Sequence, residues 1–142
     1  EPEAEAVLRS DSPEPVVLLQ RPTHLGNLGA AVRAAAAAEA AGLLATGEHD
    51  PWHASALRGA AGLHYALPVT SLAALRDDWC DRPLVAVDPD GAPLDRAGVP
   101  DRAVLAFGRP RWEWSRRRIS WRRKMPTATT ARSWPSGRSA TA

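Results

Sequence analysis

The sequence predicts an α/β fold, with a mostly parallel sheet and flanking helices, and three observations carry that prediction. Apolar runs of strand length alternate with helical segments at intervals of roughly 25 residues, an order typical of parallel sheets. The first run, Val16–Gln20, is apolar up to its last residue, as in a strand buried on both faces. A chain of 142 residues is also long enough for one domain with a core.

Three segments divide the chain. Residues 1–14 hold two prolines and four glutamates and are expected to be a disordered lead-in. Residues 15–108 are expected to form the α/β domain. Residues 109–142 are rich in Arg and Trp, contain no Leu, Val or Phe, and are expected to be disordered.

The first helix of the domain is predicted to follow a turn at Gly26–Gly29. Asn27 is expected to cap this helix, because its side chain can accept from a free N–H of the first turn. Nine of the twelve residues in Ala30–Ala41 are alanine, which favours a helix. Gly42 lies where a helix is expected to end.

The remaining elements continue the alternation. Strands are predicted over 43–46, 63–69, 84–88 and 103–107, and helices over 52–58 and 72–79, with a Ser71 cap on the last and a turn at 89–91. Ligands of parallel sheets bind outside the carboxyl ends of the strands. The candidate site therefore lies in the loops after the strands, at 21–29, 46–53, 88–91 and from 108 onward.

Charge is distributed unevenly. Residues 1–108 hold 8 Lys/Arg and 15 Asp/Glu, a balance of −7, whereas residues 109–142 hold 10 Lys/Arg and one acid, a balance of +9, which gives +2 in total. No apolar run reaches the roughly 18 residues of a membrane span, so no membrane partner is expected. A single cysteine, Cys80, and the lack of a signal peptide favour a cytoplasmic location.

The composition changes abruptly after Gly108, and three interpretations of 109–142 are open. The segment is an RNA-binding tail attracted to phosphates by counterion release, an ordinary disordered extension, or an out-of-frame translation of a GC-rich gene. In the first interpretation, Trp112, Trp114 and Trp121 stack on bases.

The order of motifs resembles the SpoU family of RNA 2′-O-ribose methyltransferases, in the knotted SPOUT class. The similar pieces lie within residues 16–108 and read VVLLQRPTHLGNLGAAVRAAAAA, GLLATG, ALRGAAGLHYALPV and RAVLAFG. The first is the most specific, because the family's first motif places Asn, Gly and Arg at the spacing of Asn27, Gly29 and Arg33. The family's second motif opens with a Gly, which Gly108 matches, but its Glu and second Gly are not at matching positions. Nothing in 109–142 resembles the third motif, so the chain is interpreted as C-terminally incomplete or frameshifted.

The resemblance implies transfer of a methyl group from S-adenosylmethionine to a ribose 2′-hydroxyl of tRNA or rRNA. It implies a cytoplasmic homodimer if the C-terminus is intact, whereas without the last two motifs the knot is expected to be missing and activity is open. It assigns catalysis to Arg33 and Asn27, cofactor binding to Gly108, and RNA binding to His24, Asn27, Gly29 and Arg33.

A ribose hydroxyl is a poor nucleophile, so a cation beside the developing alkoxide assists its attack. Arg33 is expected to stabilise that alkoxide or to position a phosphate, since a guanidinium holds its proton too tightly to act as a base. The structural alternative makes Asn27 a helix cap, Gly29 a packing glycine and Arg33 a solvated residue. The alternative function is a non-catalytic RNA-binding α/β protein with a cationic tail.

Other candidate sites are weaker. His49 and His53 lie four residues apart, but Pro51 interrupts any helix between them and no cysteine accompanies them, so a helix-entry loop is expected and no metal site. Gly26 and Gly29 lack the G-x-G-x-x-G spacing of a dinucleotide-binding turn.

Overall fold

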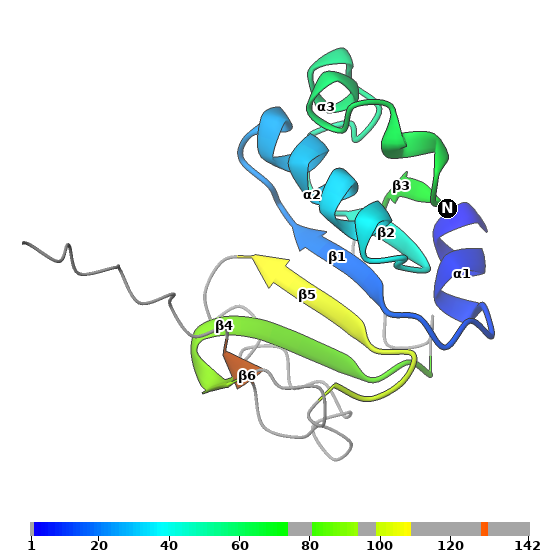
Figure 1. The fold of residues 1–142 in the computed structure, drawn as a ribbon, viewed down its shortest axis with the longest axis vertical. Coiled ribbons are helices and arrows are strands. Elements are labelled where there is room, and N and C mark those ends of the chain that lie inside the picture. The colour runs from blue at the N-terminus through cyan, green and yellow to red at the C-terminus, as the bar shows by residue number, and fades with distance from the viewer. Residues whose placement is uncertain (1, 74–80, 94–98, 109–128, 131–142) are drawn as a thin grey trace, which may run out of the picture.

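The computed structural model describes residues 2–73, 81–93, 99–108 and 129–130. Its strands form one sheet in the order β3-β2-β1-β5-β4-β6, and every neighbouring pair is parallel (Figure 1). The strands are β1 (Val16–Gln20), β2 (Gly42–Ala45), β3 (Val69–Ser71), β4 (Leu84–Pro93), β5 (Val104–Gly108) and β6 (Thr129–Thr130). The predicted α/β fold is confirmed.

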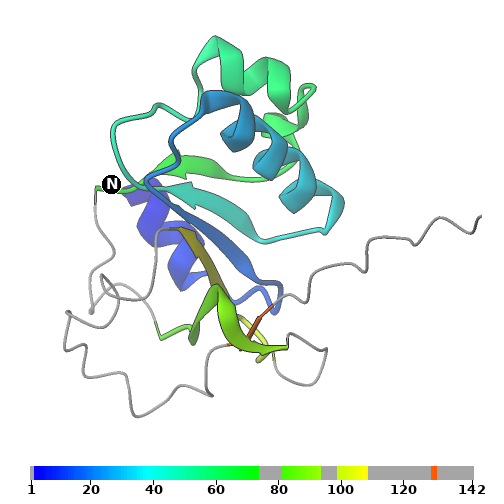
Figure 2. The same ribbon diagram turned by 90° about the vertical axis from the view of Figure 1, so that its left-hand side faces the viewer.

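Helices cover both faces of this sheet. The helices are α1 (Pro2–Arg9), α2 (Leu25–Ala37) and α3 (Ala54–Gly59), followed by the short 3₁₀ turn η1 (Leu63–Tyr65). The α1 helix lies on one side of the sheet, and α2 and α3 lie on the other (Figure 2). Within the described ranges, no helix has the length and apolarity needed to cross a bilayer.

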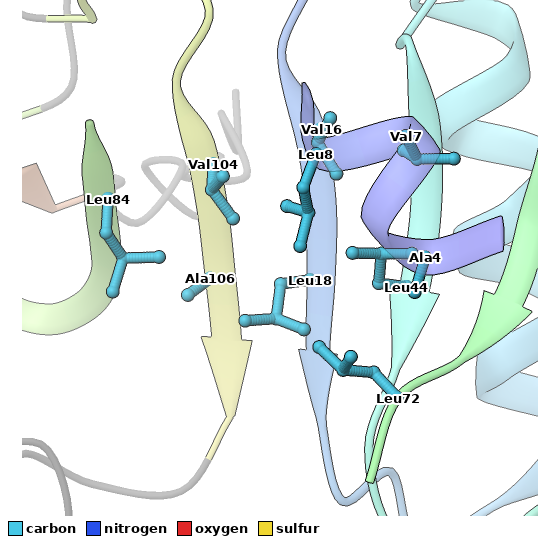
Figure 3. Packing of buried hydrophobic residues seen from close by; sticks show 10 residues of the cluster. All are labelled: Ala4, Val7, Leu8, Val16, Leu18, Leu44, Leu72, Leu84, Val104 and Ala106. Atoms are coloured by element: carbon cyan, nitrogen blue, oxygen red, sulfur yellow. The ribbon is translucent and has the colours of Figure 1, made fainter. Parts of the chain in front are cut away.

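Alternation along the strands divides the core into two clusters, because successive strand side chains point to opposite faces. Val16 and Leu18 of β1 pack with α1, together with apolar residues of β2, β5 and β4 (Figure 3). Leu43 and Ala45 of β2 pack on the opposite face against α2. The central strand is therefore covered on both sides, as its apolar run predicts.

The expectation of a disordered lead-in over 1–14 is wrong for its first part. Residues Pro2–Arg9 form α1, and Ala4, Val7 and Leu8 are buried against the sheet. These three positions share one face of a helix, and a proline is tolerated at a first helical position. Overall composition therefore misled the prediction, because three apolar residues at helical spacing are enough to dock a short helix.

The chain between α1 and β1 is held by Arg82, a buried residue that the sequence does not single out. Its guanidinium donates to the carbonyl oxygens of Leu8 at 2.9 Å, Ser10 at 2.8 Å, Ser12 at 3.1 Å, Glu14 at 3.0 Å and Arg102 at 3.3 Å. It also donates to Oγ of Ser10 at 2.8 Å. The planar guanidinium of Arg82, with its five N–H donors, thus links α1 and the chain between α1 and β1 to the sheet.

The predicted start and end of the helix after β1 are both wrong. The helix begins at Leu25 with His24 as its N-cap in an extended conformation, and it ends at Ala37 with Ala38 as its C-cap. Glu39, with φ of 55°, reverses the chain, so Gly42 is the first residue of β2 and not a helix end. Gly42 is nevertheless needed, because a Cβ there would lie 2.7 Å from Cγ1 of Val7 on α1.

Several later elements also differ from the prediction. The predicted strand over 63–69 is η1 followed by β3, and the predicted turn at 89–91 lies within β4, which continues to Pro93. Ser71 ends β3, and most of the helix predicted over 72–79 lies outside the described residues. Of the tail over 109–142 only Thr129–Thr130 is described, as a short strand beside β4, and the expectation of disorder for the segment stays a prediction.

Candidate functional site

Parallel register brings the carboxyl ends of three strands to one place, here called the carboxyl edge. Gln20 at the end of β1 pairs with Gly108 at the end of β5, and Leu19 pairs with Ala45 at the end of β2. Parallel sheets bind their ligands at such an edge. The loops after β1 and β2 are therefore positioned as the sequence predicts.

The loops after β1 and β2 are joined by backbone hydrogen bonds. The Arg21 N–H donates to the carbonyl oxygen and to Oγ1 of Thr46, each at 3.1 Å. Arg21 adopts φ of 49°, and a Cβ on Gly47 would lie 3.2 Å from Cα of Arg21. Next to these bonds, Nε2 of His49 lies 3.3 Å from the carbonyl oxygen of Thr23. These contacts fix the path of the chain that enters α2. Neither Arg21 nor Gly47 is predicted to have a role from the sequence.

The first turn of α2 exposes Asn27 and has no side-chain cap. Because the helix starts at Leu25, Asn27 is its third residue, and the expected capping role for Asn27 is wrong. Among the described residues nothing is hydrogen-bonded to its side-chain amide. The first turn also holds no acidic residue, so its free N–H groups and positive dipole end favour an anionic ligand.

Gly29 is buried between α2 and α3. An added Cβ there would overlap the carbonyl oxygen of Ala56 and lie 2.9 Å from N of Ala60 and from Cα of Gly59. The packing interpretation of Gly29 therefore accounts for this glycine. Close approach of the two helices fixes α3 beside the first turns of α2.

Arg33 is exposed, four residues after Gly29 on the same row of the helix. In the described part of the chain it makes no hydrogen bond and no ion pair. Helical side chains lean toward the N-terminus of their helix, which for α2 is the carboxyl edge of the sheet. Arg33 is therefore an exposed cation, without a partner among the described residues, on the helix that starts at that edge.

Gly108 reaches the same edge from β5, with its backbone exposed. A Cβ at this position would lie 2.6 Å from Cβ of Gln20 and 3.2 Å from its Oε1. Phe107, the preceding residue, is 40% exposed. The close approach of Gln20 therefore leaves no room for a Cβ at position 108.

The two histidines of the loop after β2 act locally. Nδ1 of His53 accepts from the N–H of Ser55 at 3.1 Å and so caps α3, while His49 contacts Thr23. The part of the chain that the structure describes contains no group of three His, Cys, Asp or Glu residues placed to hold a metal. The loop therefore enters a helix, as its sequence indicates.

Comparison with known families identifies the chain. The model of the SpoU rRNA Methylase family matches residues 14–117. The chain belongs to this family, which confirms the resemblance read from Asn27, Gly29 and Arg33. None of the curated proteins compared with it matches.

Solved structures of SpoU methyltransferases share the fold. AviRb from Streptomyces viridochromogenes, in complex with AdoMet, is 21% identical with a TM-score of 0.72, over 94% of this chain and 56% of that one. An AdoMet-bound rRNA methyltransferase from Sinorhizobium meliloti is 24% identical, with a TM-score of 0.66 over 97% and 54% of the two chains. An RNA 2′-O ribose methyltransferase is 25% identical, with a TM-score of 0.65 over 92% and 52%. The chain spans about half the length of these proteins.

Proposed function

We propose that this chain acts in RNA methylation, transferring a methyl group from S-adenosylmethionine to a ribose 2′-hydroxyl of tRNA or rRNA. The observation that carries the proposal is the exposed guanidinium of Arg33, without a partner in the described structure, on a helix that starts at the carboxyl edge. Membership of the SpoU family and likeness to a solved 2′-O ribose methyltransferase support it.

S-adenosylmethionine, when bound, supplies a methyl group on a positively charged sulfur. The ribose oxygen forms a bond to that methyl carbon, the carbon–sulfur bond breaks, and the hydroxyl proton leaves to solvent. Arg33 stabilises the negative charge that develops on the oxygen, because its guanidinium donates hydrogen bonds without giving up its proton. Asn27 orients the ribose through its free amide, and the first turn of α2 attracts a neighbouring phosphate.

The other predicted residues have supporting roles in this proposal. Gly29 acts on RNA indirectly, by letting α3 approach α2, since its own Cα is buried in that contact. His24, the exposed N-cap of α2, contacts the RNA backbone. Gly108 offers its bare backbone to the cofactor, beside the exposed ring of Phe107. A homodimer and a cytoplasmic location belong to the same proposal.

Transfer of tritium from labelled S-adenosylmethionine to bulk tRNA and rRNA tests the proposal. The whole chain is expected to label RNA, and Arg33→Ala is expected to lower the rate by about 100-fold or more, the usual cost of removing one charge-stabilising donor. Arg33→Lys keeps the positive charge but loses the planar guanidinium. Its rate of labelling is expected to lie between those of the wild-type chain and Arg33→Ala.

A second candidate function is favoured by the +9 charge of residues 109–142. RNA binding that weakens steeply with salt, without any methyl transfer, would mark the chain as a non-catalytic RNA-binding protein. Equal labelling by the wild-type chain and Arg33→Ala would contradict the role given to Arg33.

A further inference from the structure

An aromatic cluster lies outside the site described above, where the end of the loop after β2 meets η1. The ring centroids of Trp52 and Tyr65 are 5.6 Å apart in an edge-to-face arrangement, and those of Trp52 and His64 are 5.1 Å apart. His64 is buried, whereas Trp52 is 39% and Tyr65 82% exposed. The three rings thus run from the interior to the surface, and Tyr65 presents its ring to solvent.

The inner members of this cluster are held firmly. Nε1 of Trp52 donates to the carbonyl oxygen of Val69 at 2.8 Å, and the N–H of Trp52 donates to Oδ1 of Asp50 at 2.9 Å. Nε2 of His64 lies 2.8 Å from the carbonyl oxygen of Pro51. The Trp52 indole therefore supports the Tyr65 ring from one edge. A ring that is already supported loses little conformational freedom when a flat group stacks on it.

The segment that carries the cluster holds one full charge, and it is a cation. Residues 51–73 hold Arg58 and no Asp or Glu, and the nearest preceding carboxylate, that of Asp50, accepts from the N–H of Trp52. Arg58 lies in the last turn of α3, four residues before Gly62, the glycine that precedes η1, and it is exposed. An exposed ring and an exposed cation within one short segment can hold a base by stacking and its phosphate by charge.

We propose that Trp52 and Tyr65, here called the aromatic platform, form a second RNA contact, in which an unpaired base stacks on Tyr65 and Arg58 attracts the adjoining phosphate. This inference rests on the proposed function for its partner, RNA, but not on methyl transfer. The platform adds a stacking contact, tolerant of base identity, to the carboxyl edge where the ribose is methylated.

Binding of a fluorescein-labelled, single-stranded 12-nucleotide adenosine RNA tests the platform, with fluorescence anisotropy as the readout. Tyr65→Ala is expected to raise Kd at least about fivefold, the lower end of what loss of one base-stacking ring costs. Tyr65→Phe keeps the ring and is expected to stay within about twofold of the wild-type Kd. Arg58→Ala is expected to weaken binding and to reduce its dependence on salt.

The outcomes separate this inference from the proposed function. Arg33→Ala is the matched control, expected to lose methyl transfer while the Tyr65 dependence of RNA binding persists. If Tyr65→Ala leaves Kd unchanged, or if the wild-type chain does not bind the RNA, the platform is overturned whether or not methyl is transferred. If Tyr65→Ala instead changes the mass measured by light scattering and leaves Kd alone, the ring serves contact between two copies, and the inference also fails.

Discussion

Side chains near the carboxyl edge divide into those that the fold uses and those that it leaves free. His49 contacts a backbone carbonyl and His53 caps α3, so both have a structural explanation. In the described structure, Asn27 and Arg33 are exposed and make no such contacts. A polar residue without a local structural task is a better candidate for ligand binding than one that is already satisfied.

Asn27→Ala separates the two roles considered for this residue. Loss of a true N-cap costs about 1 kcal/mol of stability, but Asn27 lies inside the first turn and caps nothing, so the free energy of unfolding is expected to change by less than about 0.5 kcal/mol. Urea denaturation followed by circular dichroism measures this difference. Methyl transfer is expected to fall in the same variant, and a loss of 1 kcal/mol or more with full activity would restore the capping role.

At the scale of elements, the contact between α2 and α3 depends on one glycine. Gly29 leaves no room for a Cβ, whereas a Cβ on Gly26, one turn earlier, meets nothing within 4 Å. The same helix therefore offers a matched pair of glycines, one required by packing and one not.

Gly29→Ala is expected to destabilise the fold by about 1–3 kcal/mol, since α3 must move to make room for the added methyl group. Gly26→Ala is the control and is expected to be neutral or to stabilise by up to about 1 kcal/mol, because alanine loses less backbone entropy in a helix. Thermal unfolding of both variants provides the comparison. Equal stability of the two would show that α3 does not pack on Gly29 as described.

Arg82 holds α1 to the rest of the fold. Its guanidinium donates hydrogen bonds to carbonyl oxygens from the end of α1 to Glu14. Arg82→Met is expected to cost about 3 kcal/mol or more, because one buried and several part-buried carbonyl groups lose their donor together. Faster hydrogen exchange of the α1 amides would locate the effect. Arg9→Ala removes an exposed ion pair with Glu5, at 59% and 45% side-chain exposure, and should cost less than about 0.5 kcal/mol.

Elements were predictable where the signal is local. The apolar run Val16–Gln20 predicts β1 with its observed bounds, because a strand buried on both faces needs no polar alternation. The start of α2 was not predictable from Asn27, since an extended His24 begins the helix without any side-chain cap. Arg82 could not be found at all, because its partners lie about 70 residues away in the sequence and meet it only in the fold.

For the whole molecule, the sequence motif and the three-dimensional arrangement point to the same edge. Spacing alone relates Asn27, Gly29 and Arg33 to the SpoU family, and the family match over residues 14–117 confirms that relation. The sheet register then explains why Gly108, distant in sequence, reaches the end of β1. The chain spans about half of the solved relatives, so activity must be measured on this chain itself.

The most direct measurement is nucleoside analysis of RNA after incubation with the chain and S-adenosylmethionine. Digestion followed by mass spectrometry is predicted to reveal a new 2′-O-methylated nucleoside with the wild-type chain and about 100-fold less or none with Arg33→Ala. Methylation on a base in place of the ribose, or equal ribose methylation by both proteins, would contradict the account.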